Sequence, residues 1–263
     1  MELKIMTFNL RVNTSIDGDN AWPYRIRHVA DLVRKAEPLI IGTQEGRYDM
    51  LRDLDRELPG YSRLGEGRSG YESGDPRMDE CCAIYYRHDL FKAIRHGQFS
   101  LSETPEIPAS VSWDSSYPRF CTWACLERID ESGRRLYVYN THFDHESRLA
   151  REKSAKLLLD RITRCQAEEG LPVLLTGDFN SFPDNPAIAT LRQNLVDAYL
   201  AHPEPIGRTF HDFEGGVEGE PIDYLFFTRD VFLLETTVYR DEYEGKYPSD
   251  HYPIAARVLL NRK

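Results

Sequence analysis

The sequence predicts an α+β fold in which strand meanders are covered by helices. Helical periodicity and strand-like segments occur along the same chain, but not in the strict alternation of βαβ units. The chain has 263 residues, 41% of them apolar, which is enough for a sizeable core. Because no internal repeat or low-complexity linker interrupts it, we expect one α+β sandwich domain over residues 1–263.

The first part of the chain predicts a strand, a helix, a second strand and a second helix. Segment 3–9 ("LKIMTFN") is typical of a strand. From Ile26 to Val33 the apolar residues follow the i, i+3, i+4, i+7 spacing of an amphipathic helix, which should stop near Pro38. Segment 39–45 ("LIIGTQE") predicts a short buried strand that ends on its glutamate, and residues 47–58 suit a second helix.

The middle of the chain is rich in strand signals. The segments "CCAIYYR", "FCTWACLERI" and "RLYVYNTHF" combine β-branched and aromatic residues and are bounded by turns. The segment "DESGRR" between the last two is typical of a hairpin connection. Residues 147–166 then return to a helical pattern, with apolar side chains such as Ala155 and Ile162 on one face.

The last part of the chain predicts more strands and one capped helix. The segment "PVLLTGDFN" begins as a buried strand. Asn185 followed by Pro186 resembles a helix N-cap with proline in the first turn, and the neighbouring Asp184 is interpreted as a capping rather than a chemical group. Three further strands are predicted at 222–228, 231–239 and 253–259.

The overall composition limits the classes of partner. A formal net charge of −10 does not favour non-specific binding to a nucleic-acid backbone, although a few local arginines can offset it at one site. The five cysteines lack metal-type CxxC spacing and indicate free thiols in a reducing compartment. Since the sequence has neither a long apolar run nor a signal-peptide pattern at its start, we expect a cytoplasmic protein with no membrane partner.

Several predicted strands end on polar residues of the kinds that phosphoryl and metal chemistry use. Each alone has an ordinary explanation, because Asn and Asp are common turn formers and a lone histidine is often structural. Their recurrence at strand ends favours a shared site. The residues are Asn9, Glu45, His142 with Asp144 and His145 beside it, Asp178, Asn180, Asp223, Asp250 and His251.

Two pairs among these residues strengthen the prediction. Asp178 and Asn180 are two positions apart, so an extended chain would point both side chains to one face. Asp223 lies in an otherwise apolar strand, where an unpaired carboxylate would be costly. A histidine partner such as His251 would remove that cost, and an Asp–His pair is also how proteins orient and charge an imidazole.

The same residue types indicate a hard metal ion. Glu45 and Asp250 offer oxygen ligands suited to Mg²⁺ or Mn²⁺, which keep waters and substrate phosphate as further ligands. Zinc is disfavoured because the sequence has no HExxH motif and no Cys/His cluster. The absence of a glycine-rich loop with Lys-Ser/Thr excludes a P-loop nucleotide site. Metal, histidines and an Asp/Asn pair together suit the attack of water on phosphorus.

Six motifs follow one another in the order found in the endonuclease/exonuclease/phosphatase superfamily, which is deoxyribonuclease I-like. They are "TFNLR", "QE", "THFDH", "GDFN", "PIDYLF" and "SDHYPI", and the resemblance runs from Asn9 to His251. It implies a four-layer αββα sandwich of two mixed, mainly antiparallel sheets flanked by helices, and Mg²⁺-dependent hydrolysis of phosphoesters. The segments "SLSETPEIP" and "SWDSSYPRF" resemble a large subgroup of small, mostly bacterial members whose substrates are mostly undefined.

The resemblance implies roles for the carboxylates and amides. Glu45 resembles the principal metal ligand, with Asn9 and Asp250 close to the metal. Asp178 resembles the residue that orients or deprotonates the attacking water, and Asn180 resembles one that fixes this water and the phosphate.

The resemblance also implies roles for the histidines and their neighbours. His251, paired with Asp223, resembles an imidazolium that binds the scissile phosphate. His142 resembles a second histidine that contacts phosphate or assists the leaving group, and Glu80 takes the place of a carboxylate that partners this histidine in some members. Arg119 resembles a phosphate-contacting arginine.

Loop residues are expected to decide specificity. Ser102 and Glu103 are expected to shape the rim of the cleft. Trp22, Trp113 and Tyr117 either stack on a base or sugar of the substrate or anchor their own loops. The segments expected to carry specificity are 12–22, 62–79, 102–118 and 201–220.

Three functional hypotheses follow, in this order. The first is a metal-dependent phosphomonoesterase or phosphodiesterase acting on a phosphorylated small molecule or a nucleotide-like substrate. The second is a 3′ exonuclease on single-stranded RNA or DNA, since "THFDH" resembles the deadenylase branch, although Arg25, Arg68 and Arg119 are too dispersed for a nucleic-acid track. The third is a silent binding module that keeps the fold. The sequence leaves the oligomeric state open.

Overall fold

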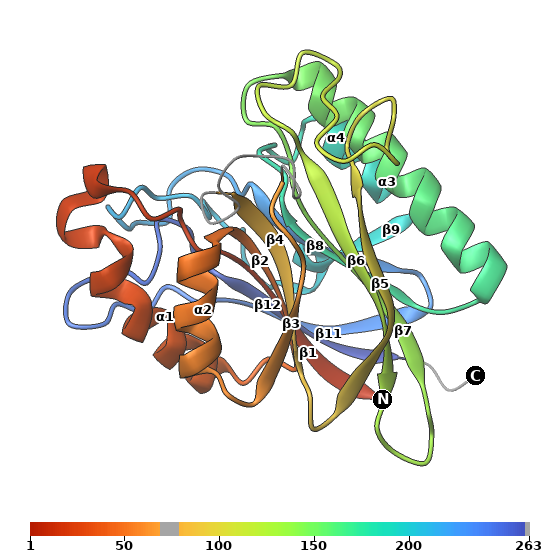
Figure 1. The fold of residues 1–263 in the computed structure, drawn as a ribbon, viewed down its shortest axis with the longest axis horizontal. Coiled ribbons are helices and arrows are strands. Elements are labelled where there is room, and N and C mark those ends of the chain that lie inside the picture. The colour runs from red at the N-terminus through yellow and green to blue at the C-terminus, as the bar shows by residue number, and fades with distance from the viewer. Residues whose placement is uncertain (69–78, 261–263) are drawn as a thin grey trace.

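Two six-stranded sheets pack face to face in this structure, a computed structural model that describes residues 1–68 and 79–260 (Figure 1). The strands of the first sheet are β1 (Glu2–Asn9), β2 (Ile40–Arg47), β3 (Tyr61–Leu64), β4 (Glu80–Arg87), β11 (Val231–Val238) and β12 (Ile254–Leu260). The strands of the second sheet are β5 (Phe91–Ser100), β6 (Phe120–Arg128), β7 (Arg135–His142), β8 (Val173–Asp178), β9 (Leu195–Asp197) and β10 (Asp223–Thr228). The strand orders are β11-β12-β1-β2-β4-β3 and β5-β6-β7-β8-β10-β9.

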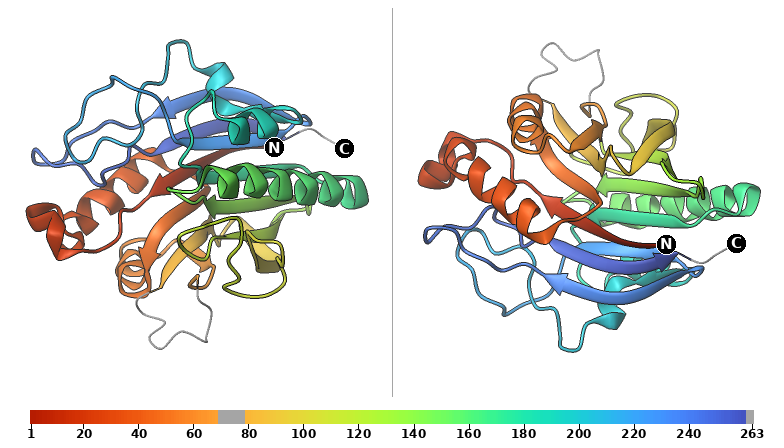
Figure 2. Two further views of the ribbon diagram at one scale, coloured as in Figure 1. Left: turned by 90° about the horizontal axis from the view of Figure 1, so that it is seen from above. Right: turned by 90° about the horizontal axis from the view of Figure 1, so that it is seen from below.

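Helices cover the outer face of each sheet. Helices α1 (Trp22–Ala36) and α2 (Tyr48–Glu57) lie on one side of the sheets, and α3 (Arg148–Glu169) and α4 (Pro186–Arg192) lie on the other (Figure 2). Short 3-10 helices occupy Ser15–Asn20 and Ala198–Ala201. Only the β1–β2 and β7–β8 pairings are parallel among the described strands. The four-layer sandwich of two mixed, mainly antiparallel sheets is confirmed.

The alternation of side chains along the central strands builds the layers. In β1, Leu3 and Ile5 pack between the two sheets, whereas Met6 and Phe8 pack under α1 and α2. Because successive residues of a strand point to opposite faces, a strand with both faces covered supplies two cores. The central strands are therefore held rigidly, and rigid strands position the polar residues at their ends.

The helices and strands predicted from the sequence are all found, and their ends are close to those expected. The prediction missed β3, β5 and β9. Strand β9 has three residues and β3 has four, too few for a pattern. Strand β5 forms an edge of its sheet, and its sequence "FKAIRHGQFS" has no regular alternation of buried and exposed positions.

Strand β2 differs from its prediction in a way that matters for the site. It does not end at Glu45 but runs on to Arg47, with a bulge between Thr43 and Gly46 opposite β4. Glu45 lies in this bulge with φ of 62°, a left-handed conformation that is rare for a residue with a side chain. A bulge re-aims a side chain without ending the strand. Here it turns the glutamate toward the end of the sandwich.

Helix α4 is capped at its N-terminus by Asn185, as predicted, and not by the neighbouring Asp184. The side chain of Asn185 accepts a hydrogen bond from Ala187 N, and Pro186 occupies the first turn. The capping role expected for Asp184 therefore belongs to Asn185, and Asp184 is exposed. Among the described helices, including the 22-residue α3, none has the length and apolarity to span a membrane.

Candidate active site

The predicted polar residues meet at one end of the sandwich. His142, Asp178 and Asp223 are neighbours in register across β7, β8 and β10, because β7 runs parallel and β10 antiparallel to β8. On the facing sheet, Asn9 ends β1 and Glu45 lies in the bulge of β2. Strand polarity therefore brings residues from distant parts of the sequence to one edge.

Asn9 joins the two sheets at this edge. Its Nδ2 donates to Glu45 Oε1 at 2.9 Å and to Asp178 Oδ2 at 3.0 Å. Its Oδ1 accepts from the backbone N–H of Arg11 at 2.9 Å. Since the amide nitrogen faces both carboxylates, Asn9 holds Glu45 and Asp178 in place. Its amide oxygen has a second lone pair beside the one that accepts from Arg11, so its position near a metal stays a prediction.

Asp178 and Asn180 reach the site through a turn rather than an extended chain. Asn180 has φ of 46°, and its backbone N–H donates to Asp178 Oδ1 at 2.9 Å. The intervening Phe179 is fully buried in the core. Gly177 permits a close strand approach, because a Cβ there would lie 2.7 Å from the backbone oxygen of Thr141. Both polar side chains still face the site, but for a different backbone reason.

His251 forms the predicted pair with Asp223. Its Nδ1 lies 2.9 Å from Asp223 Oδ2, and its Nε2 faces Asp178 Oδ2 and Asp250 Oδ1, both at 3.9 Å. Burial alone would lower the pKa of His251, but the charge and hydrogen bond of Asp223, with Asp250 and Asp178, raise it well above its usual value. The ring is therefore an imidazolium whose Nε2–H points toward the carboxylates.

His142 has the opposite charge state. Asn180 Nδ2 donates to the backbone oxygen of Phe143 at 3.0 Å and lies 3.0 Å from His142 Nε2. Because a carbonyl only accepts, the amide nitrogen faces this side and Nε2 must accept. Burial, followed by the charges of Arg119 and Arg68, lowers the pKa of His142 well below its usual value. The ring is neutral and keeps its proton on Nδ1.

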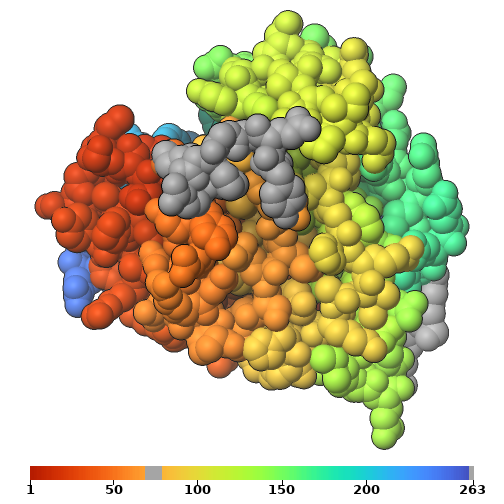
Figure 3. Space-filling model, in the orientation of Figure 1, coloured from red at the N-terminus to blue at the C-terminus, as the bar shows by residue number. Residues whose placement is uncertain are grey.

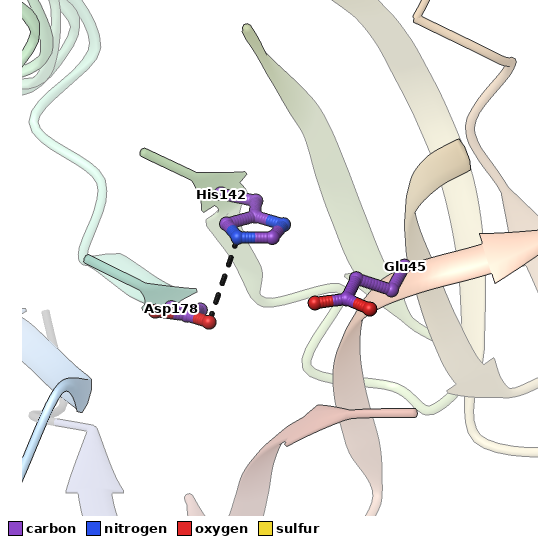
Figure 4. A group of neighbouring side chains, drawn as sticks. All are labelled: Glu45, His142 and Asp178. Carbon is purple, nitrogen blue, oxygen red and sulfur yellow. Dashed lines mark ion pairs between the residues drawn. The ribbon is translucent and has the colours of Figure 1, made fainter. Parts of the chain in front are cut away.

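Three side chains have the spacing of a single cation site. The ligand atoms of Glu45, His142 and Asp178 all lie within 4.8 Å of one another, and His142 Nε2 lies 3.5 Å from Asp178 Oδ2 (Figure 4). A second group of the same compactness, Asp178, Asp223 and His251, already contains a charged and hydrogen-bonded imidazole. The first group therefore fits a metal better than the second, with Glu45 and Asp178 as the oxygen ligands, because His142 Nε2 already accepts from Asn180.

The electrostatics of the carboxylates also fit a bound cation. Burial, and then the charge of Asp223, raises the pKa of Asp178 to about 7. Burial likewise raises the pKa of Asp250, and the charge of Glu45 adds to it. For Glu45 itself burial opposes ionisation, but His251 and hydrogen bonds from Asn9 and Val12 lower its pKa. Buried negative charge gathered around an ionised glutamate is an environment that a divalent cation neutralises.

Two arginines organise the loops around Asp250. Arg11 donates from Nε to Asp17 Oδ2 at 3.0 Å and from Nη2 to Asp17 Oδ1 at 2.8 Å. Its Nε also lies 3.6 Å from Asp250 Oδ2. Arg25, which sequence analysis counted among the dispersed basic residues, is buried and donates to the backbone oxygens of Leu10 and Pro248. It therefore ties the end of β1 to the loop that carries Asp250.

A cleft of about 680 Å³ opens over these residues. It is bordered by Arg47, Arg68, Tyr117, Arg119, His145 and Phe210. Figure 3 shows the 102–118 loop, in yellow-green, standing over this end of the molecule. Part of the 62–79 segment expected to carry specificity, residues 69–78, lies outside the described residues.

Arg119 and Glu80 are both in the cleft wall, but Glu80 has a different partner from the one expected. Arg119 Nη2 lies 3.1 Å from His145 Nδ1, and its Nε lies 3.7 Å from Asp144 Oδ2. Glu80 forms an ion pair with Arg68. His142 contacts Asn180 and Asp178, whereas the Glu80 carboxylate pairs with Arg68.

The loop residues divide into one cleft residue and several anchors. Tyr117 is half-exposed and lines the cleft. Trp22 is buried and donates to Asp53 at 3.2 Å, so it packs α1 against α2. Trp113 donates to Glu103 at 3.2 Å, which braces the loop. Ser102 contacts Ser110 Oγ at 2.5 Å within the same loop, so Ser102 and Glu103 stabilise the loop and do not border the cleft.

Sequence analysis missed a buried polar layer beneath the site. Asn140 Nδ2 donates to the backbone oxygens of Thr43 and Ala83 at 2.8 and 2.9 Å, and its Oδ1 accepts from Gln44 at 2.7 Å. These contacts cross from β7 to the β2 bulge and β4. The signal was present, because a polar residue inside the apolar segment "YVYNTHF" needs a partner for the same reason as Asp223.

An αββα sandwich with carboxylates, amides and a charged imidazole at one edge defines the deoxyribonuclease I-like class of proteins. The chain belongs to the Endonuclease/Exonuclease/phosphatase family, whose model matches residues 6–251. Members of this family are hydrolases that act on phosphate esters.

Similar proteins include both phosphatases and nucleases. The mannosyl-6-phosphatase of Bacteroides thetaiotaomicron superposes with a TM-score of 0.90 at 30% identity, covering 98% of this chain and 100% of that one. A Bacteroides vulgatus member of the family gives a TM-score of 0.90 at 30% identity, covering 99% and 100% of the two chains. The human Nocturnin catalytic domain, at 18% identity and a TM-score of 0.76 over 99% of this chain and 94% of that one, shares the fold.

Curated relatives are more distant and longer. Protein angel of Drosophila melanogaster is 25% identical over 193 residues, which are 71% of this chain and 51% of that protein. A probable RNA exonuclease of Schizosaccharomyces pombe is 24% identical over 211 residues, which are 72% of this chain and 39% of that protein. The chain therefore spans about half the length of these relatives or less.

Proposed function

We propose that the protein is a Mg²⁺- or Mn²⁺-dependent phosphoester hydrolase that directs water onto phosphorus. Two sets of contacts carry the proposal. Asn9 holds the carboxylates of Glu45 and Asp178 together. Beside them, Asp223 keeps His251 charged. The pairing supplies an anionic side for a cation and water and a cationic side for phosphate. The predicted site is thus assembled from residues of both sheets.

Glu45 and Asp178 would hold the metal, and Asn9 and Asp250 would lie near it. When bound, such a metal polarises the phosphoryl oxygens and neutralises charge that develops during hydrolysis. Hard oxygen ligands favour Mg²⁺ or Mn²⁺ over zinc. Asp178 orients the attacking water and accepts its proton, a role that suits its raised pKa of about 7.

The remaining residues hold the phosphate. His251 donates from Nε2 to a non-bridging oxygen, and its charge stabilises the transition state. Asn180 fixes the neutral ring of His142, which contacts the phosphate or assists the leaving group through its other face. Arg119 adds a guanidinium at the cleft wall. Asp223 acts through His251 and touches no substrate.

A phosphorylated small molecule or nucleotide-like compound is the proposed substrate, and we place the protein in the cytoplasm. The similarity to a mannosyl-6-phosphatase over the full length of both chains supports a small substrate. The five free cysteines support a reducing compartment. A 3′ exonuclease on single-stranded nucleic acid is the second candidate, favoured by the similarity to a probable RNA exonuclease and by the half-exposed Tyr117.

The test is turnover of a broad phosphoester panel and of labelled single-stranded oligonucleotides, each with Mg²⁺, with Mn²⁺ and with EDTA. Hydrolysis that depends on the cation and is lost in Asp178→Asn supports the proposal. Release of mononucleotides from the 3′ end, without turnover of small esters, would favour the exonuclease. Absence of all turnover at high enzyme concentration, together with no binding of Mn²⁺ by calorimetry, would refute both and favour a silent binding module.

A further inference from the structure

A small hollow beside the cleft is lined by charged side chains from both sheets. Glu45, Arg68, Glu80, Arg119 and His142 line the hollow and also the larger cleft, so the two spaces adjoin. Its volume of about 10 Å³ is close to the space that one water molecule needs. The hollow therefore has room for about one oxygen atom next to the predicted metal ligand.

The guanidinium of Arg119, one of the side chains that line this hollow, has an unused hydrogen-bond donor. Arg119 is 7% exposed, and its Nε is buried without a hydrogen-bond partner among the described residues. Its Nη2 contacts His145 Nδ1 at 3.1 Å, and the nearest carboxylate, Asp144, is 3.7 Å from Nε. The Asp144 oxygens already accept from four donors of neighbouring residues, Ser115 Oγ and the backbone N–H groups of Ser116, Glu146 and Ser147. Since a guanidinium carries five N–H donors, Arg119 retains capacity for an anionic oxygen.

Arg68 brings a second guanidinium to the same place. The centres of the Arg68 and Arg119 guanidinium groups lie 5.3 and 6.0 Å from the ring centroid of Tyr117, so both groups contact the same aromatic ring. Glu80 pairs with Arg68 and offsets its charge, which permits two guanidinium groups to stay near each other when no substrate is bound. Both arginines also act electrostatically on His142, so they lie close to the reacting centre.

The number of free oxygens distinguishes the two classes of phosphoester. A monoester has three non-bridging oxygens and, near neutral pH, close to two negative charges. A diester has two non-bridging oxygens and one charge, and its second ester group needs space of its own. Among the charged groups that line the hollow, Glu80 offsets Arg68, and Glu45 would be offset by the metal. The charge of Arg119 therefore remains to complement the additional anionic oxygen of a monoester.

We propose that Arg68 and Arg119 bind the third non-bridging oxygen of a terminal phosphoryl group in this hollow, so that the substrates are phosphate monoesters. The assignment rests on the proposed hydrolase function. Hydrolysis would form a bond between phosphorus and the water oxygen, break the bond to the leaving oxygen, and transfer a proton to that oxygen. The products are inorganic phosphate and an alcohol.

The test compares p-nitrophenyl phosphate with bis(p-nitrophenyl) phosphate, which release the same leaving group, in the presence of Mg²⁺ or Mn²⁺. The variants are Arg119→Gln, Arg119→Lys, Arg68→Gln and the double variant Arg68→Gln/Glu80→Gln. The double variant guards against misfolding, because it removes both members of the ion pair. Arg87→Gln is the matched control, since Arg87 lies on β4 like Glu80 but pairs with the exposed Asp89 outside the cleft. Thermal unfolding checks that each variant is folded.

We expect the wild type to prefer the monoester in kcat/KM, and each arginine-to-glutamine variant to lose about 10- to 100-fold on the monoester but less than about threefold on the diester. The KM of the wild type for the monoester should fall as pH rises through about 6, where the ester loses its second proton, and this fall should be weaker in Arg119→Gln. A wild-type preference for the diester, or equal losses on both esters, would overturn the assignment while leaving the hydrolase intact. If the wild type hydrolyses neither of these esters nor any other ester of the phosphoester panel, the proposed hydrolase function itself is refuted.

Discussion

His251 Nδ1 lies 2.9 Å from Asp223 Oδ2, and both side chains are buried. The other histidine of the site, His142, accepts a hydrogen bond from Asn180, and the charges of two arginines help to lower its pKa. One ring is therefore charged and the other neutral, although both lie at the same end of the sandwich. A charged imidazolium beside the carboxylates and a neutral ring that keeps its proton on Nδ1 supply different hydrogen-bond donors for phosphoryl chemistry.

Asp223→Asn should lower kcat by about 10²- to 10⁴-fold, because the carboxamide no longer stabilises the imidazolium and favours the wrong tautomer of His251. The loss should be smaller below neutral pH, where the ring is protonated without its partner. The pH profile of kcat for a phosphoester substrate measures both effects. Asp184→Asn, at an exposed aspartate beside α4, is the control. An unchanged kcat in Asp223→Asn would remove the pair from the mechanism.

Glu45→Gln should weaken Mn²⁺ binding by at least about tenfold, because a neutral amide replaces the ionised carboxylate of the predicted metal group. Isothermal calorimetry measures the affinity without substrate. In the wild type, EDTA should also lower the midpoint of thermal unfolding, since a ligand that binds only the folded state stabilises it. Glu168→Gln, at an exposed position of α3, should bind as the wild type does. Equal Mn²⁺ affinities of the wild type and Glu45→Gln would exclude Glu45 as a ligand.

Asn140→Ala should reduce the free energy of unfolding by at least about 3 kcal/mol, because it leaves several buried groups without partners. These include the backbone oxygens of Thr43 and Ala83 and the side chains of Gln44 and Thr176. Urea unfolding measures the change, and Asn194→Ala, at an exposed asparagine after α4, is the control. Since Thr43 adjoins the bulge that carries Glu45, the affinity for Mn²⁺ should fall as well. If the free energy of unfolding falls by less than about 1 kcal/mol, the buried polar layer does not depend on the hydrogen bonds of Asn140.

His211 should make the protein less stable in acid. Its ring stacks on Tyr252 with centroids 3.9 Å apart, and its Nε2 is buried without a hydrogen-bond partner among the described residues. Burial, followed by the charge of His251, lowers the pKa of His211 from 6.5 to about 3. Between these values the unfolded chain binds a proton that the folded chain does not, so this contribution to stability is lost as pH falls from about 6.5 toward about 3.

His211→Phe removes that titration and keeps an aromatic ring against Tyr252. Urea unfolding at pH 7, 6, 5 and 4 should therefore show a shallower loss of stability in the variant, by up to about 1.4 kcal/mol per pH unit for one proton. The slope is the diagnostic quantity, because the variant also loses the acceptor of the Gly215 N–H, which lowers stability at every pH. Identical slopes in the two proteins would show that His211 stays accessible to protons in the folded state.

Most of the secondary structure followed from local patterns. The apolar spacing from Ile26 to Val33, the proline after it and the Asn185–Pro186 cap are signals that act within one or two turns of chain. Strand β5 was not predicted because it is an edge strand, where burial does not impose a regular pattern of apolar residues. The continuation of β2 past Glu45 was not predicted because a bulge depends on the partner strand and not on the bulged residues alone.

The sequence by itself determined which residue types stand at the strand ends, and hence the kind of chemistry that the molecule offers. The tertiary structure decided which atoms meet. Asn9 contacts Asp178 across 169 positions, and Glu80 contacts Arg68 rather than His142. The physical reason is that hydrogen bonds and ion pairs select among partners over about 3 Å, whereas sequence patterns place residues only on a face or at an end. That choice needs the packed sheets, because their separation and register set every distance in the site.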